Sequence, residues 1–129
     1  MSATFDFSDV EKLSASLAGA SARLPAVARA VVSKAALNIK TETRATVSDD
    51  PSWKRLAQTV NYDMEGNAFY SAATVGYDDV GQGELAGIYE FGSARRDPHP
   101  TLIPAFAREA PRFEQAMTAA AAKAIEDAL

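Results

Sequence analysis

Two pairs of adjacent carboxylates and a single histidine are the residues with the clearest chemical potential in this sequence. Asp49-Asp50 and Asp78-Asp79 could act as acid–base pairs or hold a divalent cation, and His99 lies between two prolines. Adjacent acids on a loop point in different directions, however, and no third ligand follows at a fixed spacing. A metal site usually needs several His, Cys or carboxylate ligands at helical or hairpin spacing. We therefore expect solvated loop charge at both acidic pairs and a surface or interface position for His99.

Glycine and serine patterns give no stronger indication of catalysis. Gly81-x-Gly83-x-x-x-Gly87 does not have the spacing of a dinucleotide-binding fingerprint, and no Walker lysine follows it. No Gly-x-Ser-x-Gly elbow surrounds any serine. We expect no enzyme activity, no cofactor and no bound metal, and we predict a flexible acidic loop over residues 78–83.

Aromatic and basic residues are better candidates for a binding surface. Trp53 follows a proline turn, and its position fits a core residue and an interface hot spot equally well. Arg95-Arg96 is either a solvated pair or a contact for an acidic neighbouring surface. Glu90 lies between two aromatic residues, where a partly buried charge requires a partner. That partner is either one of the two arginines or, in the preferred interpretation, a local group in the following loop that Glu90 braces.

The composition is that of one globular domain. The 129 residues are 47% hydrophobic and 23% charged, and no apolar run approaches the about 20 residues that span a bilayer. The absence of cysteine excludes disulfides and zinc–thiolate sites, and the first residues lack a signal-peptide pattern, so we expect a reducing cytoplasm. A net charge of −4 argues against a nucleic-acid binder. The acidity is concentrated in residues 48–87, which hold seven acidic and two basic side chains.

The patterning predicts an α+β fold, with an antiparallel sheet packed against long N-terminal and C-terminal helices. Residues 1–7 form an arm or a short strand, and Ser8 with Glu11 has capping-box spacing. We predict helices over residues 9–18, 25–46 and 104–129, separated first by a break at residues 19–25. Two strands, 56–64 and 69–77, are joined by a turn at residues 65–67. Residues 84–91 fit a helix or a strand, and residues 92–103 form a long connection.

Apolar spacing indicates which helical faces are packed. In the second predicted helix Leu37 falls off the apolar stripe, and Pro111 should kink or divide the last helix. The stripe of the second helix consists of Leu24, Val27, Val31, Ala35 and Ile39, and that of the last helix of Phe106, Ala110, Phe113, Met117, Ala120 and Ala124.

One stretch also resembles a known family. Glu90-Phe91-Gly92, with Tyr89 before it and Ser93 after it, is followed by Pro100, Leu102, Pro104 and Ala105. In order and spacing these residues resemble the Tyr-x-x-Glu-Phe-Gly-Thr … Pro-x-(Phe/Leu)-x-Pro-Ala signature of siphophage tail-completion, or head–tail joining, proteins. The family's Pro-x-x-Thr-Gly-x-Leu stretch is kept only at Pro51 and Leu56.

The resemblance implies a structural virion protein of the phage neck. Such proteins are ring subunits, usually hexameric, that cap the tail tube and present a docking surface to the head connector. They assemble in the host cytoplasm, have no membrane partner, and let DNA pass without specific binding. The interface candidates are then Trp53, Tyr89, Glu90, Phe91, Arg95, Arg96 and His99, and the channel-lining candidates, whose charge would repel DNA phosphates, are Asp49, Asp50, Asp78 and Asp79.

Two other functions remain open at this point. A head-closure stopper or adaptor ring belongs to the same structural class and is separated poorly from a tail terminator by sequence. A small non-catalytic interaction or assembly module of the host belongs to a different class, and a stable monomer would favour it.

Overall fold

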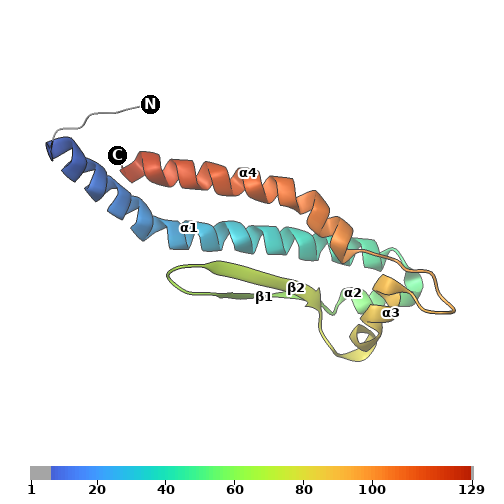
Figure 1. Ribbon diagram of the computed structural model, residues 1–129. Helices are drawn as coiled ribbons and strands as arrows, with labels where there is room; N and C mark the ends of the chain where they lie inside the picture. The colour runs from blue at the N-terminus through green and yellow to red at the C-terminus, as the bar shows by residue number, and fades with distance from the viewer. Residues whose placement is uncertain (1–6, 129) are drawn as a thin grey trace.

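The computed structural model describes residues 7–128, with side chains for residues 22–128. In chain order the elements are α1 (Phe7–Ser48), η1 (Pro51–Trp53), α2 (Lys54–Ala57), β1 (Val60–Gly66), β2 (Ser71–Tyr77), η2 (Gly81–Leu85), α3 (Ala86–Phe91) and α4 (Leu102–Ala128). Figure 1 shows α1 as the central rod, with α4 along one side and the β1–β2 hairpin along another. The predicted α+β architecture is confirmed. Within the described residues, no helix combines the length and the apolar composition needed to cross a membrane.

α1 is one helix of 42 residues, so the predicted break at residues 19–25 is wrong. Pro25 lies inside it, where proline removes one backbone donor and bends a helix without ending it if packing supports both sides. Part of that support comes from α4, because a Cβ built on Gly19 would lie only 3.6 Å from the Cβ of Ala128. Figure 1 shows the first turns of α1 inclined to the rest of the helix. The predicted arm at residues 1–7 lies outside the described residues, apart from Phe7, which begins α1.

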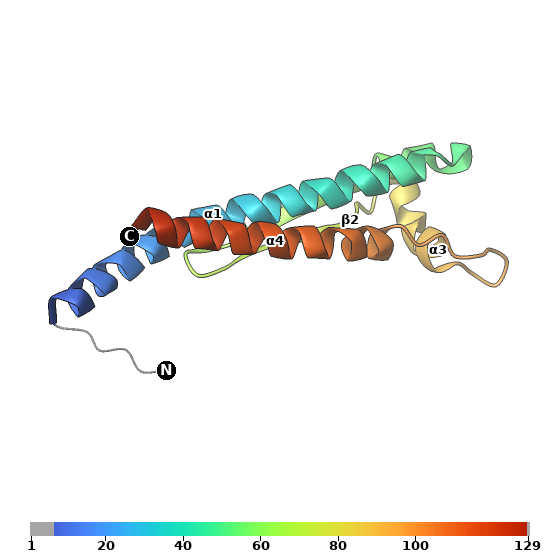
Figure 2. The same cartoon turned by 90° about the horizontal axis from the view of Figure 1, so that it is seen from above.

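α1 and α4 pack side by side along most of their length (Figures 1 and 2). α1 buries a stripe at helical spacing, and Leu37 lies off it with 42% of its surface exposed, as predicted. α4 runs through Pro111 without a break, and it buries Ala105, Glu109 and Ala124. The most buried residues of the α1 stripe are Ala36, Ile39, Thr43 and Val47.

The apolar face predicted for the last helix is packed in its later turns, where Ala124 is buried and Phe113, Met117 and Ala120 are half-buried, but it differs from the buried face in the first turns. Phe106 and Ala110, which belong to the predicted stripe, are exposed, while their neighbours Ala105 and Glu109 are buried. Sequence spacing placed Phe106 and Ala110 toward the helix partner. The first turns of α4 instead bury Ala105 and Glu109.

The hairpin pairs β1 with β2 in antiparallel register, with Val60 opposite Tyr77 and Gly66 opposite Ser71. Tyr62 and Val75, which are partners in this register, belong to the half-buried face, and the Lys40 ammonium on α1 lies 5.7 Å from the Tyr62 ring centroid. Asp63, Glu65 and Thr74 point outward and are exposed. The opposite face of the hairpin is therefore polar and acidic, as expected for a sheet covered on one side.

The main core lies where the end of α1 meets the short helices. Residues 56–59, predicted as strand, do not belong to β1, because Lys54–Ala57 form a helical turn whose Leu56 is fully buried. Residues 78–83, predicted as a flexible loop, include the first three residues of η2. The Gln82 side chain accepts from Leu56 N–H at 2.8 Å and donates to Ser52 O at 3.1 Å. The ambiguous segment 84–91 is helical. The core cluster consists of Val47, Trp53, Leu56, Ala57 and Tyr89, flanked by Tyr77 and Ala86.

Candidate functional site

The connection between α3 and α4 is a shaped loop that depends on one glycine. Gly92 follows the last residue of α3 with φ at 75°, in the region that side chains other than glycine rarely adopt. A Cβ at this position would lie 2.7 Å from Arg96 O and 2.8 Å from Pro98 N. Directly after it, Ser93 and Arg96 exchange two backbone hydrogen bonds of 2.9 and 3.2 Å. The glycine of the Glu-Phe-Gly stretch is thus required by backbone geometry.

Glu90 ties the end of α3 to the start of α4. Glu90 is only 6% exposed, and its Oε2 accepts a hydrogen bond from Thr101 N–H at 2.8 Å. Oε1 accepts from the Tyr77 hydroxyl at 2.7 Å, from the Thr101 hydroxyl, and from Leu102 N–H at 3.3 Å. Thr101 and Leu102 carry the first free N–H groups of α4, so the carboxylate caps that helix and is stabilised by its dipole. We call Glu90, Tyr77 and Thr101 the clamp.

The clamp joins three segments of the chain. Both oxygens of Glu90 accept hydrogen bonds from groups of the chain itself. Burial raises the pKa of the Tyr77 hydroxyl, and the neighbouring Glu90 carboxylate raises this pKa further, so the phenol remains a donor. The preferred sequence interpretation of Glu90, a local brace for the loop, agrees with this geometry. In the described chain Glu90 makes no ion pair with Arg95 or Arg96.

A row of contacting side chains positions the α3–α4 loop against the core. The Arg96 guanidinium lies 5.3 Å from the Trp53 ring centroid, and the Trp53 and Tyr89 rings are tilted with centroids 5.0 Å apart. His99 stacks on Tyr89 at 5.3 Å and donates its backbone N–H to Tyr89 O at 2.8 Å. Trp53 is 7% exposed, so of its two sequence interpretations the core position is the one observed. These contacts between rings and a cation give the loop a defined position on the core.

The predicted interface residues divide into a buried and an exposed set. Trp53, Tyr89 and Glu90 are buried and shape the loop from inside. Phe91, which is 74% exposed, lies at the surface together with Arg95, Arg96 and His99. Phe91 and Arg95 are therefore exposed at the surface of the loop, while Arg96, although exposed, has its guanidinium over the buried Trp53 ring.

The predicted channel-lining acids belong to two different parts of the surface. Asp49 and Asp50 border a depression shared with His99 and Pro100, and Asp50 also caps η1 by accepting from Ser52 N–H at 3.0 Å. Asp78 follows β2 and accepts from the Asn61 side chain. Among residues 22–128, whose side chains are described, no three His, Cys, Asp or Glu side chains gather as a metal site would require.

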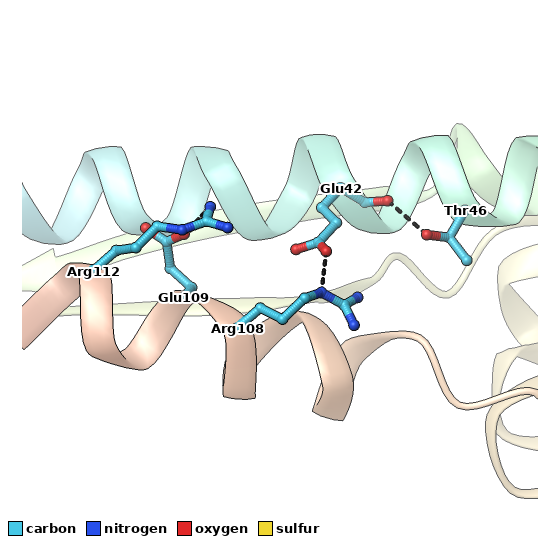
Figure 3. Close-up of polar contacts among 5 residues, drawn as sticks. All are labelled: Glu42, Thr46, Arg108, Glu109 and Arg112. Atoms are coloured by element: carbon cyan, nitrogen blue, oxygen red, sulfur yellow. Dashed lines mark hydrogen bonds and ion pairs between the residues drawn. The ribbon is translucent and has the colours of Figure 1, made fainter.

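A groove that the sequence did not reveal runs along α1 between β2 and α4. It has a volume of about 320 Å³, and most of its lining is apolar, including Val32, Ile39, Val75 and Phe113. Figure 3 shows the polar contacts of α1 and α4, where Glu42 pairs with Arg108 and Glu109 with Arg112. Glu109 is 4% exposed, lines the groove, and accepts from the Asn38 side chain at 2.9 Å.

Comparisons with protein-family models, with curated proteins and with solved structures found no match for this chain. The geometry described above is therefore what supports any functional interpretation.

Several residues of functional interest were missed by sequence reasoning. Tyr77 and Thr101 were not recognised as partners of Glu90, although a threonine before a helix start is a common capping signal. Phe69 and Tyr70 were read as the start of a strand, yet they lie in the hairpin turn with 95% and 53% of their surfaces exposed. Two aromatic residues next to a Gly-Asn turn were the available signal for an exposed tip.

Proposed function

We propose that this chain is a structural subunit of a phage neck, which associates with copies of itself into a ring that caps the tail tube and joins it to the head connector. The ring is proposed to be a hexamer, as in the family that the sequence resembles. In this proposal the protein assembles in the host cytoplasm and ends in the virion. It works as a tail terminator, without catalysis or a cofactor, and DNA passes through without specific binding.

The arrangement of the described elements is the observation that carries the proposal. α1 and α4 lie side by side with the hairpin along α1, which makes an elongated packing in Figure 1. Such a packing leaves long faces of its helices and hairpin available for contacts with neighbouring copies.

The distribution of apolar side chains supports the same proposal. Val80, Leu85, Ile88 and Phe91 are between 42% and 74% exposed around η2 and α3. Phe69 and Tyr70 form a second exposed group at the hairpin tip, at the other end of β2. A chain with apolar groups on separated surfaces fits a subunit with more than one protein neighbour.

The test is the mass of the purified protein in solution, followed by negative-stain imaging with and without tail tubes. Rings, or monomers that become rings at tube ends, are the expected outcome. A monomer that never associates with a tube or a head connector would contradict the proposal and favour a small interaction module. A ring that binds head connectors but not tubes would instead favour the head-closure stopper or adaptor, the alternative within the same structural class.

A further inference from the structure

The tip of the hairpin is an ordered aromatic projection. Residues 67–70 close the turn through two hydrogen bonds, from Asn67 N–H to Tyr70 O at 2.9 Å and from Phe69 N–H to Asn67 Oδ1 at 2.7 Å. These bonds hold Phe69 outward, where 95% of its surface is exposed. A turn already closed by hydrogen bonds loses less backbone conformational entropy than an open loop when a partner covers its aromatic side chain. The tip is therefore pre-organised for insertion into an apolar site.

The groove along α1 is an apolar site of suitable size. Its volume of about 320 Å³ is roughly twice the about 150 Å³ that encloses a benzene ring in a protein interior. α1 contributes Val32, Ala35 and Ile39, and Phe106 and Phe113 belong to the α4 wall. Phe69 of the same molecule does not fill it, since that side chain is almost fully exposed.

We propose that the hairpin tip of one copy, residues 67–70, inserts into the groove of a second copy. This inference rests on the proposed ring and assigns its subunit contact. Because the tip and the groove are different surfaces, the contact is head-to-tail, and it closes into a ring when the rotation between subunits permits. It also covers the exposed apolar surface of Phe69 and of the groove lining.

The chemistry of the two surfaces matches. Glu109 is the charged residue of the groove lining, and one of its oxygens contacts Arg112 only at 3.4 Å. Residues 66–71 carry no charge, so their insertion leaves no unpaired ion facing Glu109. Tyr70 brings a hydroxyl that can donate to the carboxylate, while Phe69 supplies the apolar contact. The other exposed apolar group, around Phe91, is a poorer occupant because the acidic Glu84 lies beside Leu85.

The first experiment separates the two halves of the contact in the full chain. Phe69→Ser combined with Tyr70→Ser removes the tip without loss of internal packing by Phe69, and Ala110→Trp fills the groove from an exposed position. Each variant should associate at least ~30-fold more weakly than the parent chain, as expected for loss of a hot spot. Ile125→Ser, an exposed change outside the groove lining, is the control and should leave association unchanged.

Mixing the two variants gives a sharper result. The Phe69→Ser, Tyr70→Ser chain keeps its groove, and the Ala110→Trp chain keeps its tip. One contact can therefore form between them, and the mixture should yield dimers that cannot add a third subunit. Sedimentation or mass photometry measures this. Larger oligomers of either variant alone, or a mixture that stays monomeric, would overturn the proposal.

Cross-linking distinguishes a contact between two copies from a contact within one chain. The chain has no cysteine, so a Phe69→Cys, Ala110→Cys double variant can be oxidised without competing thiols. A ladder of covalent oligomers supports the proposal, whereas an internally closed monomer or the absence of any bond overturns it. If the ladder forms but the parent chain never binds tail tubes, the neck function fails and the contact stands. If the parent chain caps tubes without this cross-link, the function stands and the contact fails.

Discussion

Position 90 illustrates how a buried charge can be satisfied without a basic partner. Backbone N–H groups and hydroxyls supply the donors, and all of them lie within thirteen residues of Glu90 along the chain. Such a carboxylate resists substitution because each of its oxygens accepts a hydrogen bond from a different group.

Glu90→Gln should destabilise the protein by about 2–3 kcal/mol, because its amide nitrogen cannot accept from Thr101 N–H. The free energy of unfolding in urea measures the effect. Glu84→Gln, an exposed glutamate on η2, is the matched control and should change stability by less than about 0.5 kcal/mol. Equal stability of the two variants would show that the clamp contributes nothing.

The raised pKa of Tyr77 gives the stability a dependence on alkaline pH. The folded chain holds this proton more tightly than the unfolded chain, whose tyrosines titrate near about pH 10. The contribution of Tyr77 to the free energy of unfolding is complete below that pH and is lost as the pH rises above it. Tyr77→Phe should therefore make the alkaline decline shallower, with Tyr89, whose pKa burial also raises, accounting for part of what remains. An unchanged slope of unfolding free energy against pH would contradict this assignment.

At the scale of elements, the α3–α4 connection depends on glycine at one position and tolerates change at another nearby. Gly92 has a positive φ and a crowded Cβ site, whereas a Cβ at Gly87 in α3 would have no neighbour within 4 Å. Alanine at position 92 therefore tests the cost of backbone strain, and alanine at position 87 tests the gain in helix propensity.

Gly92→Ala should lower stability by at least about 2 kcal/mol, from the left-handed conformation and the contact with Arg96 O together. Gly87→Ala should be neutral or stabilising by up to about 1 kcal/mol, because alanine favours the helix. Thermal or urea unfolding of both variants measures the difference. A Gly92→Ala protein as stable as Gly87→Ala would mean that the loop adopts another conformation.

The elements that the sequence predicted well are those with strong local signals. Helical spacing identified the middle of α1 and most of α4, and alternation located β2. The continuity of α1 through Gly19 and Pro25 was missed because it depends on packing against α4, which is distant in sequence. The helical turn at Leu56 was missed for the same reason, since Gln82 stabilises it from 26 residues away. The clamp was anticipated at Glu90, but its partners arise from the fold.

At the scale of the whole molecule, the acidic side chains gather on particular surfaces. The outward face of the hairpin carries Asp63 and Glu65, and further acids lie at the ends of α1 and β2. Repeated around a ring, such surfaces would form a negative wall, which keeps a DNA duplex from adhering.

Replacing Asp49, Asp50, Asp78 and Asp79 together by asparagine should make assembled rings retain duplex DNA at low ionic strength, where the parent rings do not. Asparagine keeps the capping oxygen at position 50, so the fold should be preserved. Gel retardation over a salt series measures the binding, which should weaken as salt screens the charges. If the variant binds DNA no more strongly than the parent does, these acids do not line a channel.

The pairing of α1 with α4 also sets the order of events during synthesis. The contacts between Asn38 and Glu109 and between Glu42 and Arg108 join residues 71 and 66 positions apart. On a ribosome, α1 and the hairpin therefore emerge long before α4, which packs against α1, and contacts of such long range form late. The groove has no second wall until α4 has been translated and docked. If copies associate through the groove as proposed, a nascent chain cannot accept a neighbour's hairpin before α4 docks, and subunit assembly would follow translation.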